Sequence, residues 1–583
     1  MKKRLLPLSL TAAILAVALP AHASPKNWVG NDDGNWTDAA RWDPSGTPGT
    51  GNIVTIGDVT ADGSSGTPVR TVTLNTGQAG GSNPIVSLIL TQTTEGFINR
   101  LLFSGTAADL RVTGLDAVNL STGTILELAS TDARGIRLRD TSSSAVNPYT
   151  ITSAGTIILA NRGAIYTQAN DAEFVTIASS GNMQFNPSIG SGDQVLIGTI
   201  VGNLNARYTL NNTGTMEFVR GLSVFGTLAT GTNHQLFHWN NNADGVVNLA
   251  TGSTDATVLM QSRSSGSVAG ETLFTTAAGS VTTIGGNDAN GTLRFSHLGT
   301  GTGGTGVNPA VSNAGVLNIN GASLIELDAA ATRYSAFNFT NTATGEVNIT
   351  GNAIIGNTTK ATLFSNEGVL NKTGAGTASI LSSGDGEALN SGTILVGDEN
   401  GTLFFSRPLT STGSLIGNGT ISVDNGGITI GNGGIVRAGL SEGDIATTFT
   451  LAAAANEAII FGEGSTLVVD LGLETGVSDH LFFDGDILLT ANNTLSIVQS
   501  AFTPGVFTVA SWSGDRIVAG EFSTILYNGA AANPSLIQVD YLDMNGTLQV
   551  TVIPEPKAAL IAGVACLLLL IGRRRLAKLS VAA

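Results

Sequence analysis

Hydrophobic and polar residues alternate in short runs along most of this chain, which predicts β-strands with one buried face. The clearest runs follow a glycine, with apolar residues two and four places later, as in Gly214 followed by Met216 and Phe218. The same pattern recurs after Gly155, Gly245, Gly315, Gly345 and Gly392, and in a degraded form after Gly368, where it ends on Lys372. We expect this glycine to supply positive φ angles at the turn before each strand.

The spacing of the glycines separates two architectures. Those at positions 315, 345, 368, 392 and 419 are 30, 23, 24 and 27 residues apart, which suits one solenoid coil better than a two-residue hairpin. A second motif, Asn-Gly-Thr before an apolar residue, begins at Asn290, Asn400, Asn418 and Asn545. Asn-Gly between strands favours antiparallel hairpins, and hence a sandwich or propeller, but the irregular spacing argues against a propeller. We predict an all-β fold built on a right-handed parallel β-helix, with the antiparallel architecture as the alternative.

Composition supports a folded β protein and excludes some functions. The 583 residues include 75 glycines, 42% are hydrophobic, and only 12% are charged, which does not fit a disordered chain. The net charge of -16 repels nucleic acid, so we expect no nucleic-acid partner. The only cysteine is Cys566, which excludes disulfides and cysteine metal sites from the body of the chain.

The N-terminus has the features of a secretory signal peptide. Lys2, Lys3 and Arg4 precede an apolar run that ends at Pro20, and Ala21-His22-Ala23 has the small-x-small form of a signal peptidase site. We predict a signal peptide over residues 1–23, cleaved by signal peptidase between Ala23 and Ser24. The alternative is an uncleaved membrane anchor.

Residues 553–583 form a second candidate targeting segment. Pro554, Glu555 and Pro556 precede an apolar stretch over 558–571, which we expect to form one transmembrane helix. The positive cluster Arg573, Arg574 and Arg575 would act as a cytoplasmic basic stop that sets the orientation. A buried C-terminal helix is the alternative, although three consecutive arginines would end such a helix poorly.

This segment resembles the PEP-CTERM sorting signal of Gram-negative bacteria. The resemblance implies recognition by an exosortase, cleavage near the motif, and release towards the outer surface. It covers about thirty residues, and one departure is the eight-residue tail from Leu576 to Ala583 after the arginines.

The segment between the two signals divides into three parts. Residues 24–60 contain Trp28, Trp36 and Trp42, which we interpret as an N-terminal cap over the open end of a solenoid; a sugar-stacking platform is the alternative. This start resembles that of autotransporter-passenger-like surface proteins, which implies a β-helix. One departure from that family is that nothing in this sequence resembles its C-terminal translocator barrel, in whose place the segment with Pro554, Glu555 and Pro556 stands. We assign residues 61–440 to β-helix repeats and 441–552 to a C-terminal β-module, either the last coils or a small sandwich.

The candidates for chemistry are weak. His234 and His238 would lie about 13 Å apart on a strand, too far for one metal ion. Asp32 and Asp33, like Asp484 and Asp486, lack the ligand spacing of a calcium loop. We therefore expect no catalytic, cofactor or metal site.

We expect an exported structural or adhesive β-solenoid of the cell surface or extracellular matrix, which presents a long face rich in Thr and Asn to extracellular polysaccharide or to a neighbouring cell. The alternative is a polysaccharide lyase or hydrolase on the same scaffold. A carboxylate cluster with a basic residue in one groove would favour the enzyme, and an unbroken Thr/Asn/Ser ladder would favour the structural role.

Overall fold

The computed structural model describes residues 23–554 and 564–571, with internal gaps. These gaps lie at 31, 59–68, 76–83, 107–108, 133, 140–147, 168–173, 189–192, 201–205, 228–235, 264–269, 287, 299–306, 332–333, 385, 442, 514–517 and 543–545. Nearly all of the described secondary structure is β-strand, in three long sheets that we call A, B and C. The described helices are a short 3₁₀ turn, η1 (Ala39–Arg41), and one helix over 564–571.

From residue 98 to residue 527, successive strands along the chain fall into sheets B, C and A in turn. Sheet A contains β3 (Trp42–Asp43), β1 (Ser24–Trp28), β4 (Asn52–Ile56), β6 (Ser87–Leu90), β9 (Asp116–Leu120), β12 (Pro148–Ser153), β15 (Phe174–Ser179), β18 (Arg207–Asn212), β21 (Leu236–Asn241), β24 (Thr272–Thr276), β27 (Ala310–Asn313), β30 (Ala336–Asn341), β33 (Ala361–Asn366), β36 (Ala388–Asn390), β39 (Leu409–Ser411), β42 (Ile428–Ile430), β45 (Ala458–Phe461), β48 (Asp486–Leu489) and β51 (Val518–Ala519). Sheet B contains β2 (Gly34–Asn35), β5 (Val69–Leu74), β7 (Ile98–Gly105), β10 (Thr124–Ser130), β13 (Thr156–Asn161), β16 (Asn182–Pro187), β19 (Thr215–Phe218), β22 (Val246–Leu249), β25 (Val281–Ile284), β28 (Val316–Ile319), β31 (Glu346–Thr350), β34 (Val369–Thr373), β37 (Thr393–Val396), β40 (Ser414–Gly417), β43 (Ile435–Ala438), β46 (Thr466–Leu471), β49 (Thr494–Gln499), β52 (Thr524–Tyr527) and β53 (Ala530–Ala531). Sheet C contains β8 (Leu110–Val112), β11 (Arg134–Leu138), β14 (Gly163–Thr167), β17 (Gln194–Thr199), β20 (Gly221–Thr227), β23 (Ala256–Arg263), β26 (Gly291–Leu298), β29 (Leu324–Leu327), β32 (Ile354–Gly356), β35 (Gly376–Leu381), β38 (Gly401–Phe405), β41 (Thr420–Val423), β44 (Thr448–Ala453), β47 (His480–Asp484), β50 (Gly505–Trp512), β55 (Thr547–Val552) and β54 (Ile537–Leu542).

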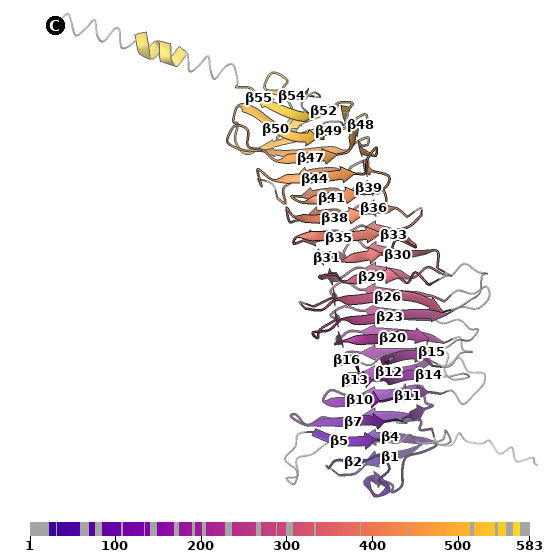
Figure 1. Cartoon of the computed structure of the whole chain (residues 1–583). Coiled ribbons are helices and arrows are strands. Elements are labelled where there is room, and N and C mark those ends of the chain that lie inside the picture. The colour runs from indigo at the N-terminus through magenta and orange to yellow at the C-terminus, as the bar shows by residue number, and fades with distance from the viewer. Residues whose placement is uncertain are drawn as a thin grey trace, which may run out of the picture.

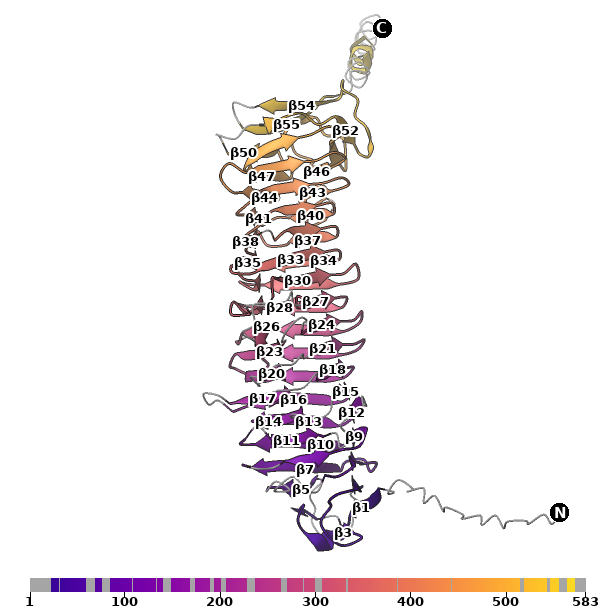
Figure 2. The ribbon, with the colours of Figure 1, turned by 90° about the vertical axis from the view of Figure 1, so that its right-hand side faces the viewer.

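One strand from each sheet makes one coil, and the coils stack into an elongated column (Figures 1 and 2). Along the column each strand pairs in parallel with its counterpart in the next coil, as β18 does with β21 and β21 with β24. Among the described strands, antiparallel pairs occur only at the two ends: β1 with β3, β50 with β55, β52 with β53, and β54 with β55. The expected parallel β-solenoid is therefore confirmed, and the expected alternative of antiparallel hairpins is wrong.

The three sheets continue through residues 441–552. Strands β42, β45 and β48 extend sheet A, and β43, β46 and β49 extend sheet B, all by parallel pairing.

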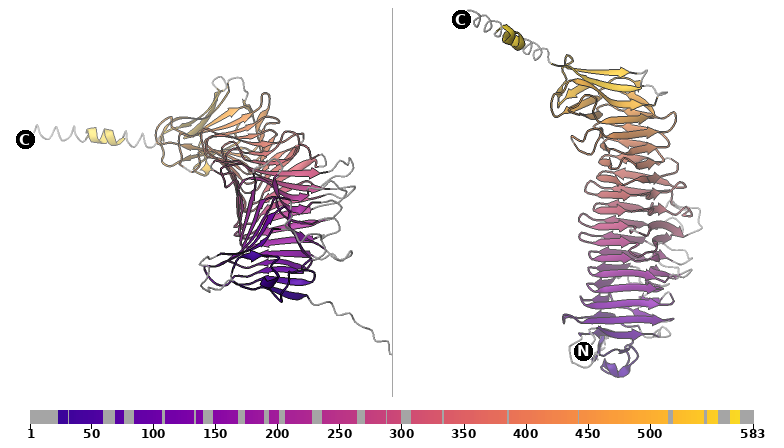
Figure 3. Two further views of the ribbon diagram at one scale, coloured as in Figure 1. Left: turned by 60° about the horizontal axis from the view of Figure 1, so that its bottom comes forward. Right: turned by 60° about the vertical axis from the view of Figure 1, so that its left-hand side comes forward.

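At the opposite end, β1 already pairs in parallel with β4, so the first coil begins at Ser24. The column as seen from two further sides is shown in Figure 3.

The inward-facing residues form one hydrophobic core that runs from Trp28 to Val552. Parallel register places like residues above one another, so Phe185 stacks on Phe218 with ring centroids 4.4 Å apart. Phe339 and Phe364 repeat this arrangement at 5.5 Å. Each coil thus buries its apolar face against its neighbours.

The repeated glycine lies at the corner between sheets A and B, and our explanation for it was wrong. None of the glycines that open these repeats has a positive φ angle. The constraint is instead close approach between coils: a Cβ atom at Gly214 would lie 2.0 Å from the carbonyl oxygen of Gly181, and one at Gly392 would lie 2.1 Å from that of Gly368. Only glycine leaves room for this carbonyl.

A ladder of buried asparagines lies beside these glycines. Asn313 Nδ2 donates to Asn341 Oδ1 at 2.8 Å, Asn341 Nδ2 to Asn366 Oδ1 at 2.7 Å, and Asn366 Nδ2 to Asn390 Oδ1 at 2.7 Å. Each amide also donates to a backbone carbonyl of the next coil, as Asn341 does to Val369 at 3.0 Å. A buried amide must have partners, so the ladder ties neighbouring coils together in one register.

Three of the four Asn-Gly-Thr motifs, those at Asn290, Asn400 and Asn418, mark the corner between sheets B and C, where they open parallel strands rather than hairpins. The fourth leads into β55, which pairs antiparallel with β54, and its Asn545 lies outside the described residues. Gly291 and Gly401 begin β26 and β38, and Asn418 and Gly419 connect β40 to β41. Gly419 therefore belongs to a different corner from Gly392, whose counterpart in the next coil is Gly413. The series of glycine spacings in the sequence therefore mixes two different corners of the coil.

A Gly368→Ala variant tests the close approach at the corner between sheets A and B. Its Cβ atom would lie 2.1 Å from the carbonyl oxygen of Gly345, so we expect a loss of about 1–3 kcal/mol in the free energy of unfolding. Denaturant unfolding would measure this loss. Gly397→Ala is the control, because its Cβ atom would have ordinary contacts of 3.5 Å or more. Equal stability of the two variants would contradict the explanation.

Lys372 is an exception within the core. It occupies the interior column between Ile349 and Val396, is 0% exposed, and donates to the carbonyl oxygens of Thr373 and Gly374. Burial lowers the pKa of Lys372, and the nearby charge of Asp398 partly opposes this shift. The folded protein therefore binds fewer protons here than the unfolded chain over the alkaline range.

We predict that Lys372→Met raises the free energy of unfolding at pH 7 by about 1 kcal/mol, because it removes a desolvated charge. In the parent protein, this residue's contribution to stability should rise as the pH increases through the lowered folded pKa towards the ordinary value of 10.5. The variant should lack that rise in denaturant unfolding measured between pH 7 and pH 10. Lys360→Met, at a half-buried position, is the control. A destabilised Lys372→Met variant would contradict the prediction.

Candidate functional site

A column of small polar side chains runs along the outer face of sheet A. Strand register aligns Asn211, Asn240, Thr275, Ser312, Thr340 and Ser365 over six successive coils. Asn240 Nδ2 donates to Asn211 Oδ1 at 2.9 Å, and Thr275 Oγ1 donates to Asn240 Oδ1 at 2.7 Å. All six residues are half-buried and so remain in contact with solvent. We call them the sheet A column.

A similar column runs along the outer face of sheet B. It contains Asn248, Thr283, Asn318, Asn348 and Asn371. Asn348 Nδ2 donates to Asn318 Oδ1 at 3.1 Å, and Asn371 Nδ2 to Asn348 Oδ1 at 3.3 Å. Both columns offer uncharged donors and acceptors at the spacing between strands, about 4.8 Å.

A cleft interrupts this regular surface near the C-terminal end. Only two residues, Asn418 and Gly419, connect β40 of sheet B to β41 of sheet C. In the following coils the connections from sheet B to sheet C are longer and cover residues 439–447, 472–479 and 500–504. The longer connections stand around a cleft of about 740 Å³. Asp470, Ser496, Gln499 and Asn528 supply polar groups to its lining, and Ile445 and Leu473 supply exposed apolar ones.

Asp470 and Arg437 form an ion pair at the cleft. Arg437 Nη2 lies 2.6 Å from Asp470 Oδ2, which also accepts the backbone N–H of Gly443 at 3.2 Å. The side chain of Asp470 is 3% exposed and that of Arg437 19%. The other carboxylate oxygen, Asp470 Oδ1, is buried and has no hydrogen-bond partner.

Asp479 is a second buried carboxyl group beside Asp470. Its backbone N–H donates to the carbonyl oxygen of Asp470 at 2.9 Å, and its Oδ1 accepts the hydroxyl of Thr447 at 2.9 Å. Asp479 is 0% exposed, and its Oδ2 has no hydrogen-bond partner. Burial, helped by the negative charge of Asp470, raises the pKa of Asp479 to about 7. Asp470, which lines the cleft, thus has an arginine and a second carboxyl-bearing residue as neighbours.

Another charged group lies near the N-terminal end, on sheet C. Tyr166 Oη donates to Asp109 Oδ1 at 2.8 Å, while Arg111 and Arg134 approach Asp109 Oδ2 at 3.8 and 3.9 Å. Burial raises the pKa of Asp109, although the tyrosine and the arginines oppose the shift. With a single carboxylate among cations, this group resembles a structural network more than an acid–base pair.

The three N-terminal tryptophans pack together inside the first coil. Trp28 meets Trp42, and Trp42 meets Trp36, each at 5.0 Å between ring centroids, and Trp42 Nε1 donates to the carbonyl oxygen of Trp36. None of the three is more than 5% exposed. A sugar-stacking platform needs an open ring face, so their burial favours the interpretation as a cap.

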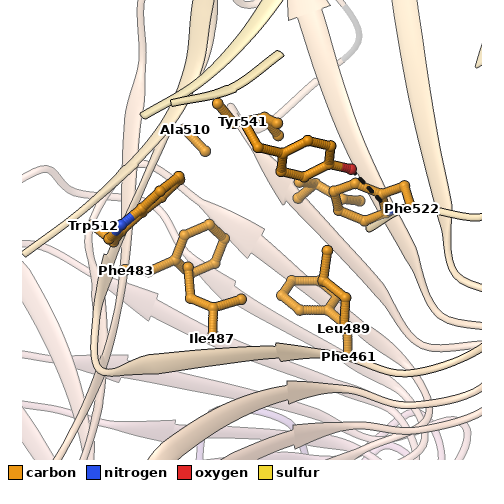
Figure 4. A pocket seen from close by; sticks show the side chains of 10 residues that line it. Phe461, Phe483, Ile487, Leu489, Ala510, Trp512, Phe522 and Tyr541 are labelled. Carbon is orange, nitrogen blue, oxygen red and sulfur yellow. Dashed lines mark hydrogen bonds between the residues drawn. The ribbon is translucent and has the colours of Figure 1, made fainter. Parts of the chain in front are cut away.

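The C-terminal end of the core is also aromatic (Figure 4). A small apolar cavity of about 20 Å³ is lined by residues that include Phe461, Phe483, Trp512 and Phe522. Two of its lining residues are joined by a hydrogen bond, in which the N–H of Phe522 donates to Tyr541 Oη at 2.8 Å. The cavity is too small for a ligand, and its apolar lining lacks the polar partners that a buried water molecule needs.

The weak metal candidates do not come together. His238 Nε2 lies 3.4 Å from Glu271 Oε2, and His234 lies outside the described residues. Asp33 accepts the N–H of Thr71 at 2.6 Å, and Asp32 pairs with Arg41 at 3.4 Å. Within the described part of the chain, no three His, Cys, Asp or Glu side chains are arranged to hold a metal ion. Asp484 ends β47, and Asp486 begins β48.

Most of the two targeting segments falls outside the described residues. Ser24 begins β1, and its N–H donates to the carbonyl oxygen of Gly51 at 3.0 Å. Pro554 is exposed just after β55, whereas Glu555, Pro556 and Arg573, Arg574 and Arg575 lie outside the described residues. Of the expected helix over 558–571, only 564–571 is described, and it is helical. No described helix is long and apolar enough to span a membrane.

Searches of protein-family models and of curated proteins found no match to this sequence. The cleft residues must therefore be judged on their chemistry alone. Sequence reasoning missed Arg437, Asp470 and Asp479 as a group, because they lie on two strands and a connection. One signal was present: Asp470 interrupts the apolar run from Leu467 to Leu471.

Proposed function

We propose that this protein is an exported structural or adhesive β-solenoid that displays polar columns to extracellular polysaccharide. The observation that carries the proposal is the sheet A column, six uncharged polar residues in unbroken register. Hydroxyl and amide groups can both donate and accept hydrogen bonds, as sugar hydroxyls do. A repeating row of such groups suits a repeating neutral polymer better than a compact ligand.

Delivery to the surface is part of the same proposal. Its support is in the sequence: a signal peptide over 1–23 and the resemblance of 553–583 to a PEP-CTERM signal. In this scheme signal peptidase cuts between Ala23 and Ser24, and an exosortase acts near Pro554, Glu555 and Pro556. The apolar segment over 558–571 holds the protein in the inner membrane until then. We also infer that the coils wind in the right-handed sense that parallel crossovers prefer.

The alternative is a polysaccharide lyase or hydrolase, and the group of Arg437, Asp470 and Asp479 is the observation that favours it. A catalytic carboxyl must reach the bond that it protonates or attacks. Asp470 is 2% exposed and Asp479 is 0% exposed, so a bound sugar would not contact the free oxygens of this pair. The geometry therefore supports the structural role better.

Export and sorting predict a defined mass for the protein recovered from the producing cells. We expect the parent protein to begin at Ser24 and to end near Pro554. A variant with Pro554, Glu555 and Pro556 all changed to alanine should keep its full tail and stay in the inner membrane. Intact-mass spectrometry of both proteins makes the comparison. A parent protein that retains 557–583 would show that the tail is a permanent anchor.

Adhesion through the sheet A column predicts a face-specific loss of binding. The double change Ser312→Glu and Thr340→Glu puts two charges into the middle of the column. We expect it to weaken co-sedimentation with the cells' own extracellular polysaccharide at least about tenfold. The matched control, Ser379→Glu with Ser422→Glu, adds the same charge to half-buried positions of sheet C.

Equal losses in the two variants would argue against recognition by this column. If the parent protein does not bind the polysaccharide, the adhesive part of the proposal is wrong, whatever the outcome of the mass measurement.

A further inference from the structure

Two carboxyl oxygens beside the cleft have no visible partner. Asp470 Oδ1 and Asp479 Oδ2 are both sealed from solvent and without a hydrogen-bond partner. Each residue's other oxygen is well satisfied, in Asp470 by Arg437 and Gly443 and in Asp479 by Thr447. Ionised carboxylates only accept hydrogen bonds, so two charged groups here would leave both oxygens unsatisfied and repel each other.

The charged groups around the two carboxyls do not supply a second positive charge that would offset their repulsion. Arg437 reaches Asp470 alone, at Oδ2. Asp444, in the connection after β43, accepts the amides of Leu440 and Ser441, and Glu474 is exposed. His480, the next residue after Asp479, directs Nε2 to Ser511 Oγ at 2.7 Å. No second cation therefore faces the pair from the described residues of these elements.

We infer that Asp470 and Asp479 share one proton, carried by Asp479 and donated to Asp470 Oδ1. The proton turns Asp479 from an acceptor into a donor, which satisfies both free oxygens and removes one of the two negative charges. The two carboxyl groups then carry a net charge of −1, which the positive charge of Arg437 balances. The proton comes from solvent and returns to it, so no other reactant is needed.

The shared proton stabilises two segments beside the cleft, residues 443–447 and the connection 472–479. Asp470 binds the backbone of Gly443, and Asp479 binds the side chain of Thr447, so both carboxyls tie residues 443–447 to the sheet. Asp479 also ends the connection 472–479, whose Leu473 lines the cleft. Loss of the proton places two like charges side by side at this junction. The device makes the cleft wall more stable in acid than in alkali, which goes beyond the proposed adhesive function.

The direction of the pH effect follows from the raised pKa of Asp479. This residue's contribution to stability is complete below the unfolded value of 3.8 and is lost as the pH rises through about 7. Amide hydrogen exchange of the full chain, corrected for intrinsic rates, can follow it at the N–H groups of Gly443 and Asp479. We expect their protection to fall at least about tenfold between pH 5.5 and pH 8.5.

Asp479→Asn should abolish this pH dependence, because an amide can donate to Asp470 Oδ1 at every pH. Asp484→Asn, which removes the exposed carboxylate at the end of β47, should keep it, and so should His480→Gln. Infrared spectra provide a second readout that does not depend on exchange: the parent protein should show one protonated carboxyl band at pH 6, absent from Asp479→Asn and present in Asp484→Asn.

Two outcomes would overturn the inference. One is a parent protein without that band, or with the same pH dependence as Asp479→Asn. The other is protection at pH 8.5 that rises with added Ca²⁺ and falls with a chelator, because a cation rather than a proton would then join the two carboxylates. Neither outcome would touch the adhesive proposal, which rests on the sheet A column.

Discussion

The close stacking of coils at the corner between sheets A and B is the constraint on which the rest of this structure depends. The backbone of each coil approaches the next so closely that the corner admits no Cβ atom, as at Gly214 and Gly392. The buried amides of Asn313, Asn341 and Asn366 add hydrogen bonds that cross from coil to coil. A slip of one residue would turn the apolar face outward and leave these amides unpaired, so the corner sets the register for all three sheets.

That register builds the inside and the outside of the protein together. Because side chains alternate, the stacking of Phe339 on Phe364 within the core also aligns Thr340 with Ser365 outside. The polar columns thus follow from the same periodicity that packs the core. Where the connections between sheets B and C lengthen, the regular surface gives way to the cleft at Asp470. Regular coils supply a long repeated surface, and irregular connections supply a local site.

The fold tolerates a few ionisable groups in its interior. Lys372 stands in an apolar column, and Asp479 lies fully buried beside another carboxyl. In a solenoid, each coil contacts mainly its neighbours, so such a cost stays local and the remaining coils can offset it. The aromatic groups at the two ends, Trp36 and Trp42 in the first coil and Phe461 and Phe522 in the last coils, protect the ends of the core.

The sequence by itself determined the class of fold, because alternation and a repeated glycine are local features that each coil carries in its own residues. It also indicated that Trp28, Trp36 and Trp42 cap the first coil. Only the tertiary structure decided why the glycines are needed, since the carbonyl that excludes a Cβ atom at Gly368 comes from another coil. The meeting of Arg437, Asp470 and Asp479 was equally hidden. Their proximity depends on register and on the path of two connections, and neither is written in the pattern of any single strand.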